Sequence, residues 1–292
     1  MHDDSFPVER PALYVVATPI GNLGDISQRA LAILRRVDWI AAEDTRVSGQ
    51  LLRHFGIDAR LLSLREHNEA SASAAIIERL RAGQAVAQVS DAGTPAVSDP
   101  GARLVAAVHA AGFKVIPLPG ASATLAALAA AGMRSPRFLF HGFPEPKSAA
   151  RREEFSRLAQ LDCSLVLFEA PHRIEESLAD MAAVFGPARE AVLARELTKT
   201  FETIRRATLG ELLEWVKSDP NQRRGELVVL IEAAPPVEDE DLAVHDKVLL
   251  PLLRELPVKQ AVKLAIEISG ASRNALYQRA LALKAENEGD DA

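Results

Sequence analysis

Short β-rich runs alternate with helical runs along the first part of this 292-residue chain. The β-rich runs cover residues 13–18, 85–90 and 114–118, and the helical runs cover 26–37 and 103–111. Such alternation is typical of a mainly parallel sheet flanked by helices. The sequence therefore predicts an α/β domain over residues 12–133.

A turn-rich segment at residues 132–136 interrupts the alternation, and a second α/β series follows it. Its expected strands cover residues 138–141, 164–169, 191–195 and 226–232. An acidic, proline-bearing stretch over 234–241 has the composition of a solvated linker, and the pattern beyond it is helical only. We therefore predict a second α/β domain over 137–234 and a small all-helical module over 242–287.

Charge is unevenly distributed along the chain. The formal net charge of −6 by itself disfavours binding to a polyanion. Residues 242–284, however, hold seven Lys or Arg against three Asp or Glu, so this segment is +4 and the rest of the chain is −10. Its helix spacing is similar to a helix-turn-helix. We expect Arg273, Tyr277 and Arg279 to contact nucleic acid, although a basic helix is equally often only a solvated surface.

Several classes of protein are disfavoured by the absence of their signals. The chain has no G-x-G-x-x-G fingerprint and no G-x-x-x-x-G-K-[ST] loop, which argues against a dinucleotide-dependent oxidoreductase and a P-loop kinase. Its start lacks the basic and apolar regions of a signal peptide, and no run reaches the ~18 apolar residues of a membrane helix. We therefore expect a cytoplasmic protein without a membrane partner. The single cysteine and the histidine spacing predict no metal site.

Three segments that follow β-rich runs are unusually rich in turn-forming residues. They are residues 18–25, 90–101 and 117–123. In open α/β sheets, ligands bind beyond the carboxyl ends of the strands, so we expect these segments to form the walls of a ligand site. The small residues of the third segment also allow the backbone to approach a ligand closely.

Seven ordered motifs carry a resemblance to a known family. They are ATPIGNLGD (17–25), AEDTR (42–46), EHNE (66–69), VSDAGTPAVSDPG (89–101), PLPGASA (117–123), FEAPHR (168–173) and RGELV (224–228). With them the chain resembles the ribosomal RNA small subunit methyltransferase I family, within the tetrapyrrole methylase fold. The resemblance implies the α/β fold of a two-domain, class III methyltransferase. It also implies a small all-α, helix-turn-helix-like module at the C-terminal end.

The resemblance also implies a reaction and a cofactor. Members of this family bind S-adenosyl-L-methionine in the cleft between the two α/β domains and methylate the ribose 2′-oxygen of a cytidine in the decoding region of 16S ribosomal RNA. The implied partners are this RNA, within the 30S subunit, and a second copy of the chain in a homodimer. Matching the motifs places the expected cofactor contacts at Pro19, Ile20, Asp91, Gly93, Thr94, Ala121, Ser122, Ala123, Glu169, Ala170, Gly225 and Glu226.

Methyl transfer to an alcohol calls for a base, because the hydroxyl becomes a good nucleophile only as its proton leaves. Polar residues in the motif segments are the candidates. We expect the base to be His67 or Glu66, and the RNA-binding side chains nearby to be Arg46, Asn68 and Arg173. The alternative is that acid and arginine side chains in these motifs, such as those of AEDTR, pair only to fix a loop.

Two other functions stay open on the sequence alone. A methyltransferase of the same fold could act on a small substrate such as a tetrapyrrole, although the AEDTR and EHNE motifs and the basic tail argue against this. A non-catalytic RNA-binding protein could use the tail alone and keep the α/β body as an assembly surface. Cofactor binding and methyl transfer to RNA would separate these possibilities.

Overall fold

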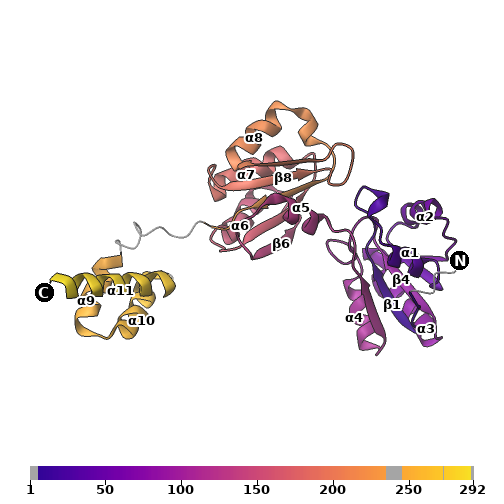
Figure 1. Cartoon of the computed structure of the whole chain (residues 1–292), viewed down its shortest axis with the longest axis horizontal. Coiled ribbons are helices and arrows are strands. Elements are labelled where there is room, and N and C mark those ends of the chain that lie inside the picture. Colours follow the sequence, from indigo (N-terminus) through magenta and orange to yellow (C-terminus); the bar gives the residue numbers. More distant parts are fainter. Residues whose placement is uncertain (1–5, 235–244, 272, 291–292) are drawn as a thin grey trace. The chain divides into compact units, whose positions relative to one another are not determined.

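The computed structural model describes residues 6–234, 245–271 and 273–290 (Figure 1). They form two compact units, one ending at Ala233 and the other beginning at Ala234. The first unit holds two five-stranded sheets, and the second holds helices. Within the described ranges, no helix is both long enough and apolar enough to cross a membrane.

The first sheet is parallel throughout. Its strands are β1 (Ala12–Val16), β2 (Trp39–Ala42), β3 (Leu61–Ser63), β4 (Ala85–Val89) and β5 (Lys114–Leu118), in the spatial order β3-β2-β4-β1-β5. Val16, the last residue of β1, pairs with Val89 of β4 on one side and with Leu118 of β5 on the other. The loops after these three strands therefore begin side by side at one edge of the sheet.

Helices cover both faces of this sheet. Helices α1 (Gln28–Leu34) and α2 (Thr45–His54) pack on one face, and α3 (Glu69–Arg81) and α4 (Ala102–Ala110) pack on the other. Successive strand residues point to opposite faces, so Leu13 belongs to the core under α3 and α4. The predicted α/β class, with a parallel sheet flanked by helices, is confirmed.

The second sheet is mixed. Its strands are β6 (Phe138–Gly142), β7 (Ser164–Glu169), β8 (Glu190–Arg195), β9 (Thr203–Thr208) and β10 (Leu227–Ile231), in the order β6-β7-β10-β8-β9. Only β6 and β7 run parallel, and the other neighbours are antiparallel. Helices α6 (Ser148–Leu158), α7 (Ile174–Phe185) and α8 (Leu209–Ser218) pack on one face, and α5 (Ala123–Ala131) packs on the other.

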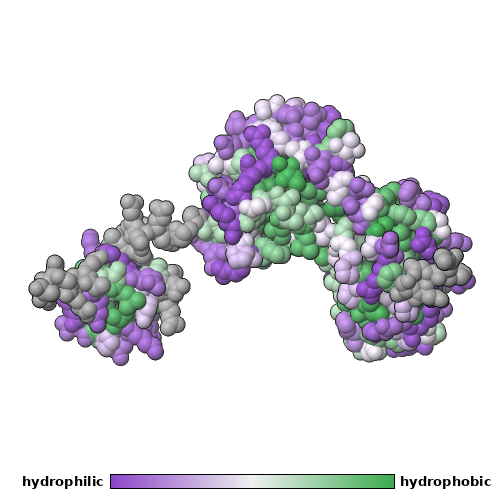
Figure 2. All heavy atoms as spheres, in the orientation of Figure 1, coloured by the Kyte–Doolittle hydropathy of each residue, from purple (hydrophilic) through white to green (hydrophobic). Residues whose placement is uncertain are grey.

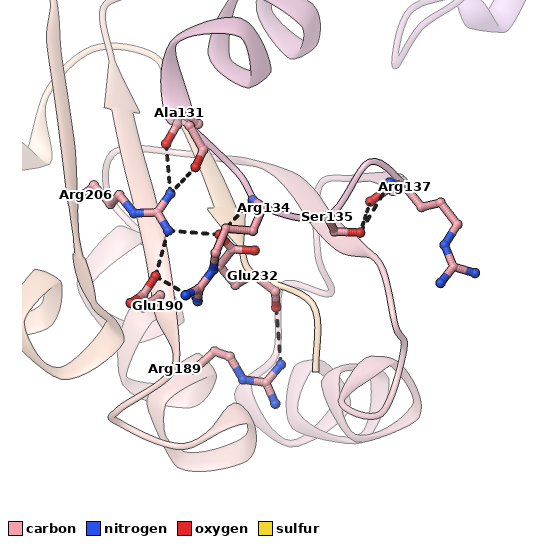
Figure 3. Close-up of polar contacts among 9 residues, drawn as sticks. Ala131, Arg134, Ser135, Arg137, Arg189, Glu190, Arg206 and Glu232 are labelled. Atoms are coloured by element: carbon pink, nitrogen blue, oxygen red, sulfur yellow. Dashed lines mark hydrogen bonds and ion pairs between the residues drawn. The ribbon is translucent and has the colours of Figure 1, made fainter. Parts of the chain in front are cut away.

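An ion-pair network fixes the carboxyl end of α5 to the second sheet (Figure 3). Helix α5 ends at Gly132, whose φ of 62° is left-handed. The Arg206 guanidinium of β9 donates to the carbonyls of Ala131 and Gly132, and it also pairs with Glu190 at 2.6 Å and Glu232 at 2.9 Å. These contacts anchor α5, whose opposite end lines the site described below.

The C-terminal unit is a bundle of helices around a small apolar core. It contains α9 (Asp246–Glu255), α10 (Val258–Ser269) and α11 (Arg273–Asp290). Gly270, with a φ of 68°, caps the carboxyl end of α10. Most of the expected linker, residues 235–241, lies outside the described residues.

The surface of the first unit carries an apolar area, seen in green in Figure 2, on the part formed by α5 and β6. Leu125, Phe138 and Leu139 are exposed large apolar side chains on these two elements. Contiguous exposed apolar surface marks interaction sites more often than isolated residues do.

Candidate functional site

The loops after β1 and β4 are joined directly to each other. The backbone N–H groups of Thr18 and Gly93 each donate to the other residue's carbonyl, with N···O distances of 2.9 Å. Gly93 has a φ of 81°, and a Cβ built there would lie 3.2 Å from the Ile20 side chain. Glycine is therefore favoured at the point where the two loops meet.

The loop over residues 90–101 is held in an unusual conformation. Ala96 and Ser98 have left-handed φ angles of 67° and 62°, which side chains other than glycine rarely adopt. The loop ends at Gly101, where a Cβ would overlap the buried Gln88 amide at 1.6 Å. The buried carboxylate of Glu69 accepts hydrogen bonds from the backbone N–H groups of Gly101 and Arg103, so the EHNE motif fixes the end of this loop.

A cavity of about 370 Å³ lies between these loops and the second sheet. Nine of the twelve expected cofactor residues line it, and they come from five separate motifs: Ile20, Gly93, Thr94, Ser122, Ala123, Glu169, Ala170, Gly225 and Glu226. Ser122 also caps the amino end of α5, so free N–H groups of that helix face this region. We call this the first cavity.

The other three expected cofactor residues have different surroundings. Pro19 and Asp91 line a second cavity of about 310 Å³, which also borders α2. The Ala121 carbonyl accepts a hydrogen bond from the Thr94 hydroxyl at 3.0 Å. That contact ties the loop after β5 to the loop after β4.

Two polar atoms in the lining of the first cavity are buried without a hydrogen-bond partner among the described residues. They are Oε2 of Glu169 and Oγ1 of Thr124. The other Glu169 oxygen accepts from the N–H of Ala170 at 2.8 Å and lies 3.2 Å from Nε of Arg173. A buried carboxylate oxygen left unpaired is costly, and it indicates a donor supplied by a ligand.

Arg173 was expected to bind RNA, but its guanidinium is engaged within the protein. In addition to the Glu169 contact, it donates to the carbonyls of Pro144 and Glu145 at 2.7 and 3.1 Å. Its side chain is largely buried. The contacts show that Arg173 fixes Glu169 and the loop after β6.

A glycine position shapes the opposite wall of the first cavity. Gly225 has a φ of 81°, and a Cβ there would lie 2.3 Å from the Glu196 carboxylate. That carboxylate accepts from the N–H of Glu226 and from Nζ of Lys199, both at 2.9 Å. Burial works to lower the pKa of Lys199, but its hydrogen bonds to Glu196 and Glu226 outweigh burial and raise it.

The expected base and its neighbours line neither cavity. Glu66 and His67 are exposed in a short 3-10 helix (Glu66–Asn68), and Asn68 uses its side-chain oxygen to accept from the N–H of Arg65 at 2.7 Å. The structure therefore gives no support to a catalytic role for Glu66 or His67, which stays a prediction.

The AEDTR motif contains the loop-fixing pair that the sequence left as an alternative. Arg46 pairs with Asp44 at 2.6 Å while 82% of its side chain stays exposed. Its hydrogen bonds hold the pKa of Asp44 well below the usual range. Asp44 in turn caps α2.

Two expected RNA-binding residues of the C-terminal unit are described. Arg279 makes a two-pronged ion pair with Asp246, at 2.9 and 2.7 Å, which ties α11 to α9. Tyr277 is partly exposed on α11. The side chain of Arg273 lies outside the described residues.

Asp99 is a residue of the first cavity that the sequence did not single out. It is half-buried, and its pKa is raised by burial and by the nearby Asp91 carboxylate. Burial also raises the pKa of Glu43, and Asp99 and Asp91 raise it further. An acidic residue inside a turn-rich segment after a β-rich run was the available sequence signal. Among the described residues, no group of three or more His, Cys, Asp or Glu could hold a metal ion.

Comparison with known proteins gives family matches over most of the chain. Residues 12–213 match the Tetrapyrrole (Corrin/Porphyrin) Methylases, and residues 239–284 match the RsmI C-terminal HTH domain. A Ribosomal RNA small subunit methyltransferase I from Pseudomonas aeruginosa is 54% identical over 271 residues, which cover 92% of this chain and 96% of the relative. A protein of the same name from Escherichia coli O157:H7 is 51% identical, over 92% of this chain and 94% of that protein.

Solved structures with the same fold are more distant in sequence. Cobalt precorrin-4 methyltransferase superposes with a TM-score of 0.57 at 20% identity, covering 76% of this chain and 94% of that one. Diphthine synthase superposes with a TM-score of 0.58 at 19% identity, covering 76% of this chain and 90% of that one. At these identities the likeness shows the fold. With the family matches, it establishes that the chain is a methyltransferase of the tetrapyrrole methylase fold and belongs to the ribosomal RNA small subunit methyltransferase I family.

Proposed function

We propose that this protein transfers a methyl group from S-adenosyl-L-methionine to the ribose 2′-oxygen of a cytidine in the decoding region of 16S ribosomal RNA. The observation that carries the proposal is the convergence of five separate motifs on one cavity. The names of relatives about 50% identical to the chain supply the substrate class, small-subunit ribosomal RNA. We further propose that the substrate is the RNA within the assembled 30S subunit and that the protein acts in the cytoplasm.

The lining of the first cavity supports the proposal of this cofactor. Its lining includes the acidic side chains of Asp99, Glu169 and Glu226, of which Glu169 pairs with Arg173 and Glu226 with Lys199. The unpartnered oxygens of Glu169 and Thr124 suit the amino and hydroxyl groups of a nucleoside. When bound, the sulfonium cofactor supplies an electrophilic methyl group. The residues of this chain hold it in place, and positioning alone is worth up to about 7–11 kcal/mol of a two-substrate barrier.

Asp99 is better placed than His67 or Glu66 to take the proton of the ribose hydroxyl. It lines the first cavity, whereas the other two are exposed elsewhere. Its raised pKa makes its ionised form a stronger base than an ordinary aspartate. Near-normal turnover of the His67→Ala variant would exclude His67 as the base. A large loss of turnover with unchanged cofactor affinity would instead support His67 as the base.

The C-terminal unit is proposed to bind RNA. Its residues 242–284 are basic, and residues 239–284 match a helix-turn-helix domain. Arg273 and Tyr277, near the start of α11, are proposed contacts. Arg279 holds the fold of the unit through Asp246, so its contribution to RNA binding would be indirect. The proposed functional parts of the chain are residues 12–133, 137–234 and 242–287.

A homodimer is proposed because the first unit exposes an apolar area on α5 and β6. Burying Leu125 and Phe138 against a second copy would remove this surface from water. Sedimentation of the wild type and of Phe138→Glu tests it. A dimer that becomes a monomer in the variant supports the proposal, and a monomeric wild type contradicts it.

The test of the function is methyl transfer in vitro. The full-length chain is incubated with methyl-labelled S-adenosyl-L-methionine and purified 30S subunits that lack the modification, and label in 16S RNA is counted. Naked 16S RNA and a tetrapyrrole serve as comparison substrates. Label in the 30S RNA supports the proposal, and label only in the tetrapyrrole, or none in any substrate, refutes it.

A further inference from the structure

The second cavity is separate from the one assigned to the cofactor. It is lined by the loop after β1, by one face of α2 and by the first residues of the loop after β4. On α2 its lining residues include Val47, Leu51 and His54, which are spaced to share one face of the helix. Its volume of about 310 Å³ is that of a small-molecule site.

The two cavities lie on opposite sides of the same two loops. Pro19 lines the second cavity, and the next residue, Ile20, lines the first. In the loop after β4, Asp91 lines the second cavity and Gly93 lines the first. The backbone pair Thr18 and Gly93 joins the two loops to each other. A ligand in the second cavity would therefore lie next to the methyl-donor site without occupying it.

A buried hydroxyl in the second cavity has no partner among the described residues. Ser48 is 2% exposed and lines the cavity, and its Oγ makes no hydrogen bond there. A helical serine hydroxyl commonly bonds to the carbonyl four residues earlier, but here the Asp44 carbonyl accepts the Ser48 backbone N–H and the hydroxyl is left without a partner. Leaving a buried hydroxyl unpaired costs free energy, so the hydroxyl is expected to meet a ligand.

The rest of the lining defines the chemistry of that ligand. Pro19, Leu23, Val47 and Leu51 are apolar, and Leu23 and Val47 keep about two fifths of their surface exposed. Such side chains pack against the faces of a flat ring. Asp91 supplies a carboxylate that accepts from an amino group, and its Oδ1 is fixed by the N–H of Asp44 at 3.0 Å. The lining holds no Lys or Arg, so it does not suit a phosphate.

We propose that the second cavity binds an unpaired nucleobase of the substrate RNA that carries an exocyclic amine, namely cytosine or adenine. Asp91 accepts from the amine, Ser48 bonds to the ring edge, and the apolar residues cover the ring faces. Sequence-specific RNA recognition uses unstacked bases bound in this way. The inference rests on the proposed function, because RNA is the substrate there.

The test compares binding of cytidine and uridine 5′-monophosphates to the full-length chain by titration calorimetry in the presence of saturating S-adenosyl-L-methionine. Cytosine carries an amine where uracil carries a carbonyl. We expect the cytidine nucleotide to bind about tenfold more tightly. Asp91→Asn keeps an oxygen for the Asp44 N–H and replaces the other oxygen with a donor, so it should abolish or reverse this preference.

Two further variants separate recognition from folding. Ser48→Ala should weaken the cytidine nucleotide about fivefold and leave cofactor affinity unchanged. Arg53→Ala, on the same helix and outside the cavity lining, should bind as the wild type does. Equal affinity for the two nucleotides, no binding of either of them or of adenosine 5′-monophosphate, or displacement of the cofactor by cytidine monophosphate would overturn the inference. If the chain still methylates 30S subunits in that case, the proposed function stands and only the base site fails.

Discussion

Glu69 gives the sharpest test of how the site is built. Its Oε1 accepts from the backbone N–H groups of Gly101, Arg103 and Leu104, at 2.9, 3.0 and 3.3 Å, at the amino end of α4. These N–H groups have no partners inside the helix. A hydrogen bond to a charged group contributes about 1.5–3 kcal/mol, and three bonds to one oxygen are not additive. We predict that Glu69→Ala lowers the free energy of unfolding by about 3 kcal/mol.

The assay is calorimetric melting of the full-length chain. A loss of about 3 kcal/mol in a unit of this size should lower Tm by about 6–12 °C. Glu69→Gln keeps an accepting oxygen and should lose only about 1 kcal/mol. Glu66→Ala, an exposed acid in the same motif, is the matched control and should stay within about 0.5 kcal/mol of the wild type. If Glu69→Ala melted like Glu66→Ala, the assignment of Glu69 as the anchor of the 90–101 loop would be wrong.

Four other outcomes follow from the contacts described. Asp99→Asn should lower kcat about 10²–10⁴-fold in the methyl-transfer assay, and an unchanged kcat would exclude Asp99 as the base. The wild-type rate should rise as the pH passes through the raised pKa of the Asp99 carboxyl. Gly225→Ala should raise the cofactor Kd at least about tenfold by calorimetry, because its Cβ meets a carboxylate. Arg279 holds the pKa of Asp246 below its ordinary value, so this pair stabilises the C-terminal unit above pH ~4. The stabilisation is lost as the pH falls through the lower pKa that Asp246 has in the folded state. Amide NMR should show that the Asp246→Asn variant no longer has this acid sensitivity. Deleting the residues after Asp241 should weaken RNA binding more than cofactor binding and reduce its salt dependence, as filter binding at several salt concentrations would show.

Much of the fold could be predicted because its central strands are apolar and clearly bounded. Strands β1, β4 and β5 coincide with the β-rich runs expected over 13–18, 85–90 and 114–118. The sequence does not predict strands β2 and β3, because four and three residues are too few to show a pattern. Strand β9 was missed as well, since Thr203–Thr208 holds two arginines and two threonines at the edge of its sheet.

The site could be predicted only in part, because strand order is not visible in the sequence. The loops after β4, β1 and β5 are neighbours in the sheet, and they supply the expected cofactor residues of the first domain. Glu66 and His67 follow β3, which lies at the sheet edge, two positions from β4 and three from β1. Their polarity and loop position resembled those of site residues, but the topology places their loop beyond β2. Asp99 lies in a segment that the sequence singles out, but its place in the cavity lining and the burial of Ser48 are not visible in a single sequence.

The central claim is that the first cavity serves methylation of a ribose 2′-oxygen in small-subunit RNA. The most direct measurement is alkaline hydrolysis of 16S RNA labelled by the enzyme on 30S subunits, followed by nucleoside analysis. A 2′-O-methyl group blocks attack of that oxygen on the adjacent phosphate, so we predict label in an alkali-stable dinucleotide that yields 2′-O-methylcytidine or a derivative of it. Label released in ordinary mononucleotides, or an unlabelled RNA from a protein that binds the cofactor, would contradict it.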